Sequence, residues 1–595
     1  MSAQLQANTL QEAQSQPSAG SKPREMTGAH IFLNCLIAEG IDTFFGMPGG
    51  VILSIYEALQ DYPQLNHVLV RHEQGAGHMA EGYARSTGKV GVMLATSGPG
   101  ATNLVTALAD AYYDSVPVVA FTGNVPTALL ANDSFQEADI VGITRPITKH
   151  NIMVRDVRDM TQAIKEAFHI AKSGRPGPVL VDIPKDVLLQ KSTFDYAAAQ
   201  IELPGYSVQE SFTDADLEAV LNLLKEAKRP MMLVGGGVVS SGAYQEAIAF
   251  AERFNLPVGS SLMGLGAFPH GHPQFYGFTG MHGHYWTNIA IANADVLIIA
   301  GNRLGERQTG KADRFARNAK IVHIDLDPTS LQKNVDAVIP VQGELRNVFC
   351  KLLKKCENNM GAFADSMQTR DEWYATIDEW KNRRKPQDMT PEANGGFLTP
   401  QHVIDRIFHF MPKDGFVTTE VGQHQMWAAQ RHNLNRPRSF ITSGGLGTMG
   451  FGFPAAIGVQ AAFPDKTVVD IAGDGSFQMT LQELATARDS KLPVKVAIIN
   501  NGFLGMVRQW QDKTWNRDSH SKMTSPDYVK LAEAYGCAGF VVEDPADLDR
   551  VIQEAFAITD RPVIIDFHVS ERADVYPWVP AGGANEEMLT EPDRH

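Results

Sequence analysis

Short apolar runs alternate with segments of helical periodicity along most of the chain. In its first part the runs occupy residues 90–95, 118–122 and 179–183, bounded by glycine, proline or polar residues. Such runs predict buried strands, and the longer periodic stretches between them predict helices. Strands that alternate with helices favour a parallel sheet in an α/β domain.

The same alternation returns twice further along the chain. Apolar runs at 230–234, 296–300 and 321–324 mark a second block, and runs at 468–472 and 494–499 mark a third. We therefore expect α/β domains at residues 26–190, 205–353 and 397–576. The remaining segments are expected to be a disordered polar N-terminal tail at 1–25, a charged helix and linker at 354–396, and a C-terminal tail at 577–595.

Composition narrows the classes of function. The 595-residue chain has a formal net charge of −15, which argues against nucleic acid as a partner because its phosphates would be repelled. The four cysteines form no C-x-x-C pair, so neither a disulfide framework nor a zinc site is indicated. No apolar run reaches the length of a membrane span, and the first residues lack an apolar signal core, so we expect a cytoplasmic protein.

Polar residues follow two of the predicted strands of the third block. Gly473-Asp474-Gly475-Ser476 comes after the run at 468–472, and Asn501 comes after the run at 494–499. One strand–helix–strand return separates them, so both strand ends should meet at the same edge of the sheet. Glycines before a helix allow a phosphate to approach the backbone, but Asp474 alone would repel it. A magnesium ion between the two resolves this conflict, because it prefers oxygen ligands.

The segment 473–501 resembles the cofactor motif of thiamine-diphosphate-dependent enzymes, whereas an isolated Gly-Asp-Gly is more often an ordinary turn. The resemblance implies that Asp474, Asn501 and the carbonyl of Phe503 hold magnesium. It also assigns residues to the cofactor itself, namely Gln423, His424, Met449, Gly475, Ser476 and Met506. For His424 the alternative is a structural histidine, and for Met449 it is plain core filling.

A glutamate after the apolar run at 67–70 matches the family's activating acid. By resemblance, Glu73 pairs with the pyrimidine ring of the cofactor and so promotes removal of the proton from thiazolium C2. That role needs a buried carboxyl, whose pKa rises through desolvation. The alternative is a surface glutamate at a strand end, which is the commoner place for a charged residue.

Nearly all of the chain after Met26 resembles the catalytic subunits of the acetohydroxyacid synthase family. The segments that carry the resemblance are 46–50, 71–85, 96–110, 134–137, 148–150, 505–510 and 576–582. It implies three doubly wound parallel-sheet domains of the thiamine-diphosphate enzyme type. Residues 26–190 would bind the pyrimidine, 205–353 would form an FAD-binding-like domain, and 397–576 would bind the diphosphate.

The implied reaction is decarboxylation of pyruvate and carboligation to a second 2-keto acid, pyruvate or 2-ketobutyrate. The products would be 2-acetolactate or 2-aceto-2-hydroxybutyrate, in branched-chain amino acid biosynthesis. By resemblance the reacting centre includes Gly50 and Gln136 beside Glu73, and the substrates meet Phe135, Trp510, Arg307 and Lys149. A planar guanidinium suits a carboxylate. The alternatives are a surface ion pair with Glu306 for Arg307 and core packing for Trp510.

The central block carries a pattern that resembles an FAD site. Its residues are Gly235, Gly236, Gly237, Met281, His282 and Asp325. A glycine triplet can also be only a strand-end turn. Glu202 stands where the family commonly has an arginine that contacts FAD, so we expect FAD to bind more weakly than is usual. Residues 305–308 and 512–522 also depart from the family pattern.

The resemblance implies a homodimer or homotetramer, because the glutamate domain of one chain faces the diphosphate domain of another. A small regulatory subunit is a further possible partner. Two other readings stay open from the sequence. One is a different pyruvate-using relative, such as a pyruvate oxidase or a sulfoacetaldehyde acetyltransferase, and the other is a thiamine-binding scaffold without turnover.

Overall fold

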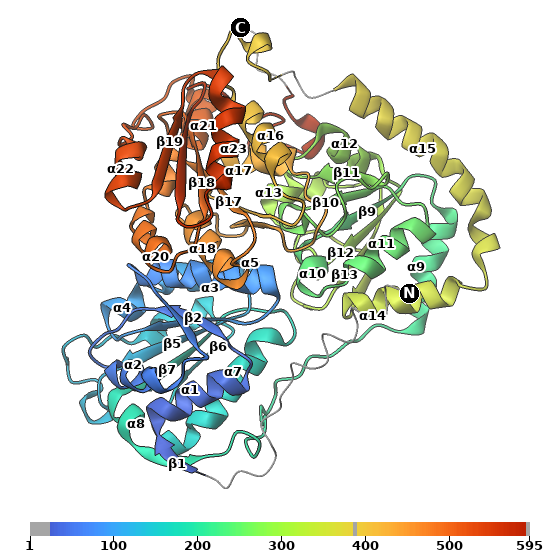
Figure 1. Ribbon diagram of the computed structural model, residues 1–595. Coiled ribbons are helices and arrows are strands. Elements are labelled where there is room, and N and C mark those ends of the chain that lie inside the picture. Colours follow the sequence, from blue (N-terminus) through green and yellow to red (C-terminus); the bar gives the residue numbers. More distant parts are fainter. Residues whose placement is uncertain (1–23, 385–388, 591–595) are drawn as a thin grey trace, which may run out of the picture.

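A computed structural model describes residues 24–384 and 389–590 and shows three α/β domains (Figure 1). Within these residues each domain is built on a six-stranded sheet, and every strand pair of the three sheets is parallel. The expected fold class of three doubly wound parallel-sheet domains is confirmed. None of the described helices has the length and apolar character needed to cross a membrane.

The first and third domains share one strand order. The first sheet runs β3-β2-β4-β5-β7-β6, and the third runs β16-β15-β17-β18-β20-β19. The strands of the first domain are β2 (Thr43–Gly46), β3 (Asn66–Leu69), β4 (Gly91–Ala95), β5 (Val118–Asn124), β6 (His150–Met153) and β7 (Val179–Pro184). Those of the third are β15 (Phe416–Thr419), β16 (Phe440–Thr442), β17 (Val468–Gly473), β18 (Lys495–Asn500), β19 (Ala538–Val542) and β20 (Val563–His568). One architecture is therefore used twice.

The central domain has a different order, β11-β10-β9-β12-β13-β14. The chain reverses direction across the sheet between β9 and β12, which is the arrangement that binds dinucleotides at its switch point. The strands are β9 (Pro230–Val234), β10 (Val258–Ser260), β11 (Phe275–Phe278), β12 (Val296–Ala300), β13 (Lys320–Asp325) and β14 (Ile339–Gln342).

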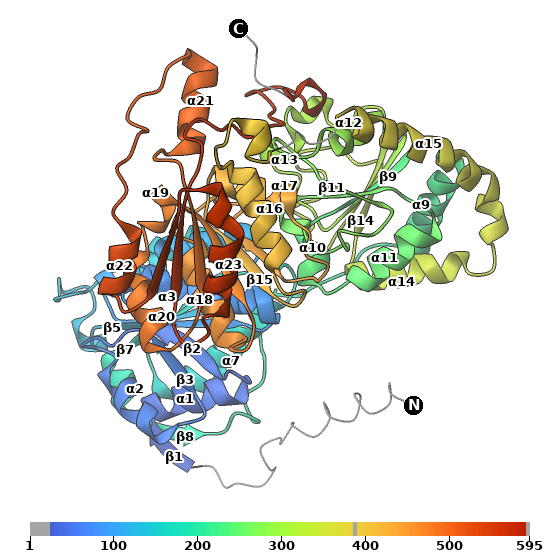
Figure 2. The same ribbon diagram turned by 45° about the horizontal axis from the view of Figure 1, so that its top comes forward.

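Helices cover both faces of the sheets. The first domain has α1 (Gly28–Ala38), α3 (Glu73–Thr87), α5 (Val105–Asp114) and α7 (Met160–Lys172). The central domain has α9 (Asp214–Glu226), α11 (Tyr244–Arg253), α12 (Tyr285–Asn293) and α14 (Leu345–Cys356). The third has α16 (Pro400–Phe410), α17 (Gln423–Arg431), α18 (Gly452–Ala462), α21 (Gly505–Trp515), α22 (Tyr528–Ala534) and α23 (Leu548–Ala557). Figure 2 shows α21 projecting beyond the third sheet.

The first and third domains meet through two helices in very close contact. A side chain at Gly82 of α3 would overlap Ala455 O of α18, and one at Gly458 of α18 would overlap Met79 O. Glycine is therefore required where the two backbones touch. Figure 1 shows this contact, with α3 running beneath α18.

The domain edges differ from the expectation. Residues 1–23 of the expected N-terminal tail lie outside the described residues, but β1 (Arg24–Thr27) already belongs to the first domain. It pairs antiparallel with β8 (Lys191–Phe194), so this domain also continues past residue 190. A two-stranded antiparallel ribbon thus joins the two ends of the first domain.

The expected linker at 354–396 contains a helix that packs against the central domain. This helix, α15 (Ala364–Arg383), lies along the outside of that domain in Figure 1. Its Trp373 and Ile377 are buried, and Trp380 continues the same face at helical spacing. Charged residues occupy the opposite face, which is why the sequence predicted a solvent-exposed segment. Residues 385–388 lie outside the described part of the chain.

The expected C-terminal tail is packed as well. Trp578, Val579 and Met588 are buried together with Met281 of the central domain. A β-bridge joins Gly310 to Ala584, and Arg314 pairs with Glu586 at 2.9 Å. The segment as far as residue 590 therefore belongs to the fold, because its apolar side chains cover the central domain.

Candidate active site

Two adjacent strand ends place the predicted metal ligands together. β17 and β18 are parallel neighbours with Gly473 beside Ile499, so Asp474 and Asn501 follow at the same edge of the sheet. Both are buried, at 1% and 7% exposure. They line one cavity with the other residues assigned to the metal and the cofactor, Gln423, His424, Met449, Gly475, Ser476, Phe503 and Met506. Sequence reasoning thus identified residues that the fold brings together.

The cavity has the features of an anion cradle. The Nε2 atom of His424 is buried without a hydrogen-bond partner among the described residues, and burial lowers the pKa of this histidine to about 3. A side chain at Gly475 would lie 2.8 Å from Leu504 Cδ2, so the backbone there has no room for one. An unpartnered ring nitrogen and a backbone turn without side chains leave hydrogen-bonding capacity for a diphosphate, and we call this space the diphosphate cavity.

Asp474 is a buried carboxyl at the strand end. Burial raises its pKa to about 6, and its Oδ2 accepts a hydrogen bond from Ser525 Oγ at 3.1 Å. A divalent ion at this position would stabilise the ionised carboxylate. Asn501 Oδ1 lies beside it and accepts from Phe503 N at 3.1 Å. The donor set of carboxylate, amide oxygen and carbonyl fits magnesium.

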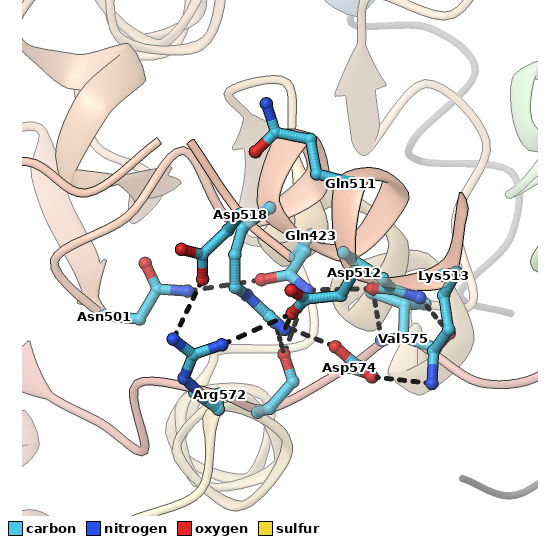
Figure 3. Close-up of polar contacts among 12 residues, drawn as sticks. Gln423, Asn501, Gln511, Asp512, Lys513, Asp518, Arg572, Asp574 and Val575 are labelled. Carbon is cyan, nitrogen blue, oxygen red and sulfur yellow. Dashed lines mark hydrogen bonds and ion pairs between the residues drawn. The ribbon is translucent and has the colours of Figure 1, made fainter. Parts of the chain in front are cut away.

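A hydrogen-bonded group behind the cavity fixes Gln423 (Figure 3). Its Oε1 accepts from Asn501 Nδ2 at 3.2 Å, and its Nε2 donates to Gln509 Oε1 and Ala573 O, both at 2.9 Å. The sequence had not assigned Gln509, although it lies inside the family-like segment 505–510. Gln509 is 1% exposed, and this burial, which the sequence does not show, identifies it as part of the hydrogen-bonded group.

An ion cluster anchors α21 next to this group. Arg508 is 2% exposed and pairs with Asp512 at 2.9 Å and Asp574 at 2.8 Å. Figure 3 shows Arg572 reaching Asp512 and Asp518 from the other side. The divergent stretch after Trp510 is therefore held to the end of the third domain by charges.

Glu73 begins α3 and is 7% exposed. Its Oε2 accepts a hydrogen bond from Asn103 Nδ2 at 2.9 Å, a partner that the sequence had not indicated. It is not among the residues that line the diphosphate cavity. The acid is therefore buried, as expected, but on the first domain and apart from the metal ligands of its own chain.

The other first-domain candidates lie in loops that follow the strand ends. Gln136 has a left-handed backbone with φ 59°, and its carbonyl lies against Gly98. Its neighbour Phe135 is 88% exposed, and Gly50 is also exposed in the loop after β2. None of these three residues lines the diphosphate cavity of this chain.

Arg307 and Trp510 are brought together from different domains. The guanidinium lies 5.6 Å from the indole centroid, and Trp510 packs edge-on against Trp578 at 5.3 Å. Arg307 also pairs with Glu306 at 3.3 Å, and both side chains are exposed. The surface ion pair therefore exists alongside the contact with the indole.

Lys149 lies away from these residues. Its Nζ binds Ser173 O at 2.7 Å and Ile170 O, which are carbonyls at the end of α7. It lines a second cavity, between the first and central domains, that also contains Arg175 and Asp327. Burial, helped by the charge of Arg175, lowers the pKa of Lys149 to about 8. The structure thus separates it from the diphosphate cavity.

The central glycine triplet lies at the switch point of its sheet, after β9. Side chains at Gly235 and Gly237 would overlap the backbone of Gly301, which follows β12. Close packing therefore accounts for these two glycines, as the strand-end turn would require. The packing also leaves the loop flat where a ligand would approach.

The other FAD candidates lie near this central sheet. His282 Nδ1 is 3.0 Å from Pro577 O, and Met281 is buried under the C-terminal segment. Asp325 ends β13, and burial raises its pKa to about 6. Glu202 is exposed and lines neither cavity. Weak binding of FAD therefore stays a prediction.

Family models match each domain in turn. They are the thiamine pyrophosphate enzyme N-terminal TPP binding domain at residues 26–143, the central domain at 217–352 and the C-terminal TPP binding domain at 420–567. Thiamine pyrophosphate is another name for thiamine diphosphate. The matched C-terminal region includes all residues that line the diphosphate cavity.

Curated relatives match along almost the whole chain. The acetolactate synthase large subunit of Haemophilus influenzae is 44% identical, over 95% of this chain and 98% of its own length. Acetolactate synthase of Mycobacterium bovis is 47% identical, over 95% and 91%. Acetolactate synthase isozyme 3 large subunit of Escherichia coli is 44% identical, over 95% and 98%. With its fold and its diphosphate cavity, the chain belongs to the acetolactate synthase large-subunit family of thiamine pyrophosphate enzymes.

Proposed function

We propose that the chain catalyses thiamine-diphosphate-dependent decarboxylation of pyruvate and carboligation to a second 2-keto acid. The product is 2-acetolactate from two pyruvates, or 2-aceto-2-hydroxybutyrate with 2-ketobutyrate, in branched-chain amino acid biosynthesis. The observation that carries the proposal is the cavity at the ends of β17 and β18, in which Asp474 and Asn501 lie with His424.

The diphosphate end is held by the third domain. Asp474, Asn501 and the carbonyl of Phe503 would bind magnesium, and His424 would hydrogen-bond the diphosphate through its unpartnered Nε2. Gln423 orients Asn501 through the 3.2 Å hydrogen bond between their side chains. Bound thiamine diphosphate supplies the electron sink for loss of carbon dioxide from a 2-keto acid.

Glu73 acts at the pyrimidine end. Its buried carboxyl shares a proton with the pyrimidine ring nitrogen, and Asn103 holds the other carboxylate oxygen in place. With thiamine diphosphate bound, this proton sharing would make the amino group of the pyrimidine basic enough to remove the thiazolium proton. Gln136 and Gly50 line the reacting centre, and the exposed Phe135 closes over it.

Acceptor choice is made by Arg307 and Trp510. The guanidinium is exposed, planar and already held beside the indole, so it is available to pair with the acceptor carboxylate. The indole limits the size of the acceptor side chain. Lys149 is bonded to helix carbonyls, and we propose that it supports the substrate site only indirectly.

Two chains form the complete site. The diphosphate cavity is lined by third-domain residues, whereas Glu73, Gln136 and Phe135 belong to the first domain. A first domain from a partner chain would supply them, so the chain works as a homodimer, or as a homotetramer of two such dimers. Relatives are named large subunits, and we infer a small regulatory subunit as a further partner.

FAD binds at the central sheet. The strand order and the glycine-rich turn at its switch point fit a dinucleotide. Arg175, in the cavity between the first and central domains, would provide positive charge for a pyrophosphate. Arg175→Ala should therefore lower the flavin retained after dialysis by roughly tenfold, the loss expected for one charge-assisted hydrogen bond. Arg158→Ala, at an exposed arginine of the same domain, should retain as much flavin as the wild type and is the matched control. A variant at Arg175 that keeps all its flavin would contradict this site.

The acceptor step distinguishes this function from that of other pyruvate-using enzymes. Purified protein with thiamine diphosphate, Mg²⁺ and pyruvate should release carbon dioxide and form 2-acetolactate. Adding 2-ketobutyrate should divert product to 2-aceto-2-hydroxybutyrate, and Trp510→Leu should weaken this preference by about tenfold. Formation of acetyl phosphate or acetate in place of the carboligation product would overturn the proposal.

A further inference from the structure

The loop at residues 443–450 delivers Met449 to the diphosphate cavity and is rich in glycine. It contains four glycines, and two of them, Gly447 and Gly450, have φ of 76° and 89°. Glycine loses more conformational freedom on folding than other residues. Contacts from outside the loop must therefore fix its conformation.

The first of these contacts comes from α5 in the first domain. The carboxylate of Asp114, at the end of this helix, accepts from Gly444 N at 3.0 Å and from Gly445 N at 2.7 Å. Its side chain is fully buried. Hydrogen bonds to an ionised acceptor are the strong ones, so one carboxylate holds two consecutive glycines of the third domain.

A second carboxyl acts one helical turn earlier on α5. Asp110 Oδ1 accepts from Ser443 Oγ at 2.6 Å and from Thr448 Oγ1 at 3.2 Å. Ser443 Oγ in turn accepts from Gly447 N at 3.1 Å and Thr448 N at 2.9 Å. The loop is thereby closed on itself and tied to α5 at the residue that precedes Met449.

An arginine on α3 completes the connection. Arg85 Nη2 lies 2.6 Å from Asp114 Oδ2, and Arg85 also donates to Thr442 O at the start of the loop. Its guanidinium lies 5.4 Å from the ring centroid of Phe451, just past the end of the loop. Because α3 begins at Glu73, one helix carries both the proposed activating acid and the cation that holds the methionine loop.

We propose that Arg85, Asp114 and Asp110 are positioning residues that clamp the 443–450 loop and so set where Met449 supports the cofactor. None of the three lines the diphosphate cavity, so they act through the loop. The inference rests on the proposed function, because the position of Met449 matters to the reaction only when thiamine diphosphate occupies the cavity.

The two acids of the clamp have different partners. Burial raises the pKa of Asp110 well above its usual range, and the charges of Glu81 and Asp114 add to this. Asp114 is the direct ion-pair partner of Arg85, whereas Asp110 accepts from the hydroxyl groups of Ser443 and Thr448. Asp110→Asn preserves an acceptor oxygen, and Asp110→Ala removes that acceptor.

The test follows proton–deuterium exchange at C2 of thiamine diphosphate bound with Mg²⁺. Arg85→Met/Asp114→Asn removes both charges, so no unpaired buried charge is left to unfold the protein. We expect wild-type affinity for thiamine diphosphate, but exchange slowed by roughly tenfold to a hundredfold, as expected when a reacting group is slightly misplaced. Exchange at the wild-type rate would overturn the clamp.

The Met449→Ala background shows whether the clamp acts through the methionine. In this background the double substitution should slow exchange no further, because coupled residues are not additive. Equal slowing in both backgrounds would show that the clamp acts elsewhere and would overturn the inference. Wild-type exchange in Met449→Ala alone would instead refute the proposed role of Met449, so the two failures are distinguishable.

A second pair of variants covers the case in which the double variant does not fold. Asp110→Ala should slow exchange and Asp110→Asn should not, with the unfolding temperature of each measured as a control. Equal exchange rates in the two variants would contradict the clamp. Rescue by the asparagine is a result that a merely space-filling aspartate would not give.

Discussion

At the scale of single residues, Asp474 should make magnesium binding depend on pH. Burial raises its pKa from the usual 3.8 to about 6 in the metal-free protein, so below this pH a proton competes with magnesium. The folded apo protein gains stability as pH falls through 6, whereas the metal-bound form needs the ionised carboxylate. Calorimetry should therefore show Mg²⁺-dependent thiamine diphosphate affinity that is full above pH 6 and falls about tenfold per unit below it.

Asp474→Asn is the matched control for this pH dependence. It keeps an amide oxygen but cannot ionise, so its weakened affinity should no longer vary with pH in this range. Wild-type affinity that stays constant between about pH 5 and pH 7 would contradict the assignment of Asp474 as a metal ligand.

Glu73 gives the second prediction at this scale. Glu73→Gln should reduce turnover by at least about a hundredfold, while thiamine diphosphate still binds, because only the shared proton is lost. Exchange at C2 of the bound cofactor measures the effect directly. Glu57→Gln, an exposed glutamate in the same domain, should leave both unchanged. Unimpaired exchange in Glu73→Gln would show that Glu73 is not the activating acid.

Some site residues could be predicted from sequence and others could not. Asp474 and Asn501 follow apolar strands, so the topology of a parallel sheet alone predicts that they meet. Asn103 and Gln509 act as hydrogen-bond partners, and no spacing rule marks such partners. Lys149 was assigned by resemblance, but its side-chain direction depends on the carbonyls at the end of α7.

At the scale of elements, the crossing of α3 and α18 sets the relation between two domains. Gly458→Ala should lower stability by about 3 kcal/mol or prevent folding, because its side chain would overlap Met79 O of the facing helix. Urea denaturation, compared at the transition midpoint, measures this. Gly271→Ala is the control, because a side chain there meets no atom within 4 Å. Equal midpoints would show that the helices can separate without cost.

The strands were the most predictable elements, and the charged helix was the least. The runs at 230–234 and 296–300 coincide with β9 and β12, because strands covered on both faces contain almost only apolar residues. In α15 the buried face is marked by a few apolar residues, among them Trp373, Ile377 and Trp380. The charged residues between them hide this apolar face when only the composition of the segment is considered.

At the scale of the whole molecule, the division of site residues between domains predicts complementation. Glu73→Gln and Asp474→Ala chains should each be inactive, but a refolded mixture should recover part of the activity, because one of the two sites in a mixed dimer receives both intact residues. Light scattering should show that the active species is at least a dimer. A fully active monomer, or a mixture without recovery despite proven subunit exchange, would contradict the shared site.

The matching strand orders establish that one fold is repeated in the first and third domains. The contacts between domains were beyond prediction. Asp114 and Gly444 are far apart in the sequence, and nothing in either segment shows that a carboxylate will meet that loop. The packing of the C-terminal segment was also missed, because its apolar residues are few.

Carbon-13 spectroscopy of the reaction with labelled pyruvate tests the account most directly. With pyruvate labelled at C2, thiamine diphosphate and Mg²⁺, we expect 2-acetolactate labelled at its ketone carbon and at the adjacent carbon that bears the hydroxyl. One carbon dioxide should be released per two pyruvates. Asp474→Ala under the same conditions should give none. Labelled acetate or acetyl phosphate as the main product, or no consumption of pyruvate by protein that has bound thiamine diphosphate, would contradict the account.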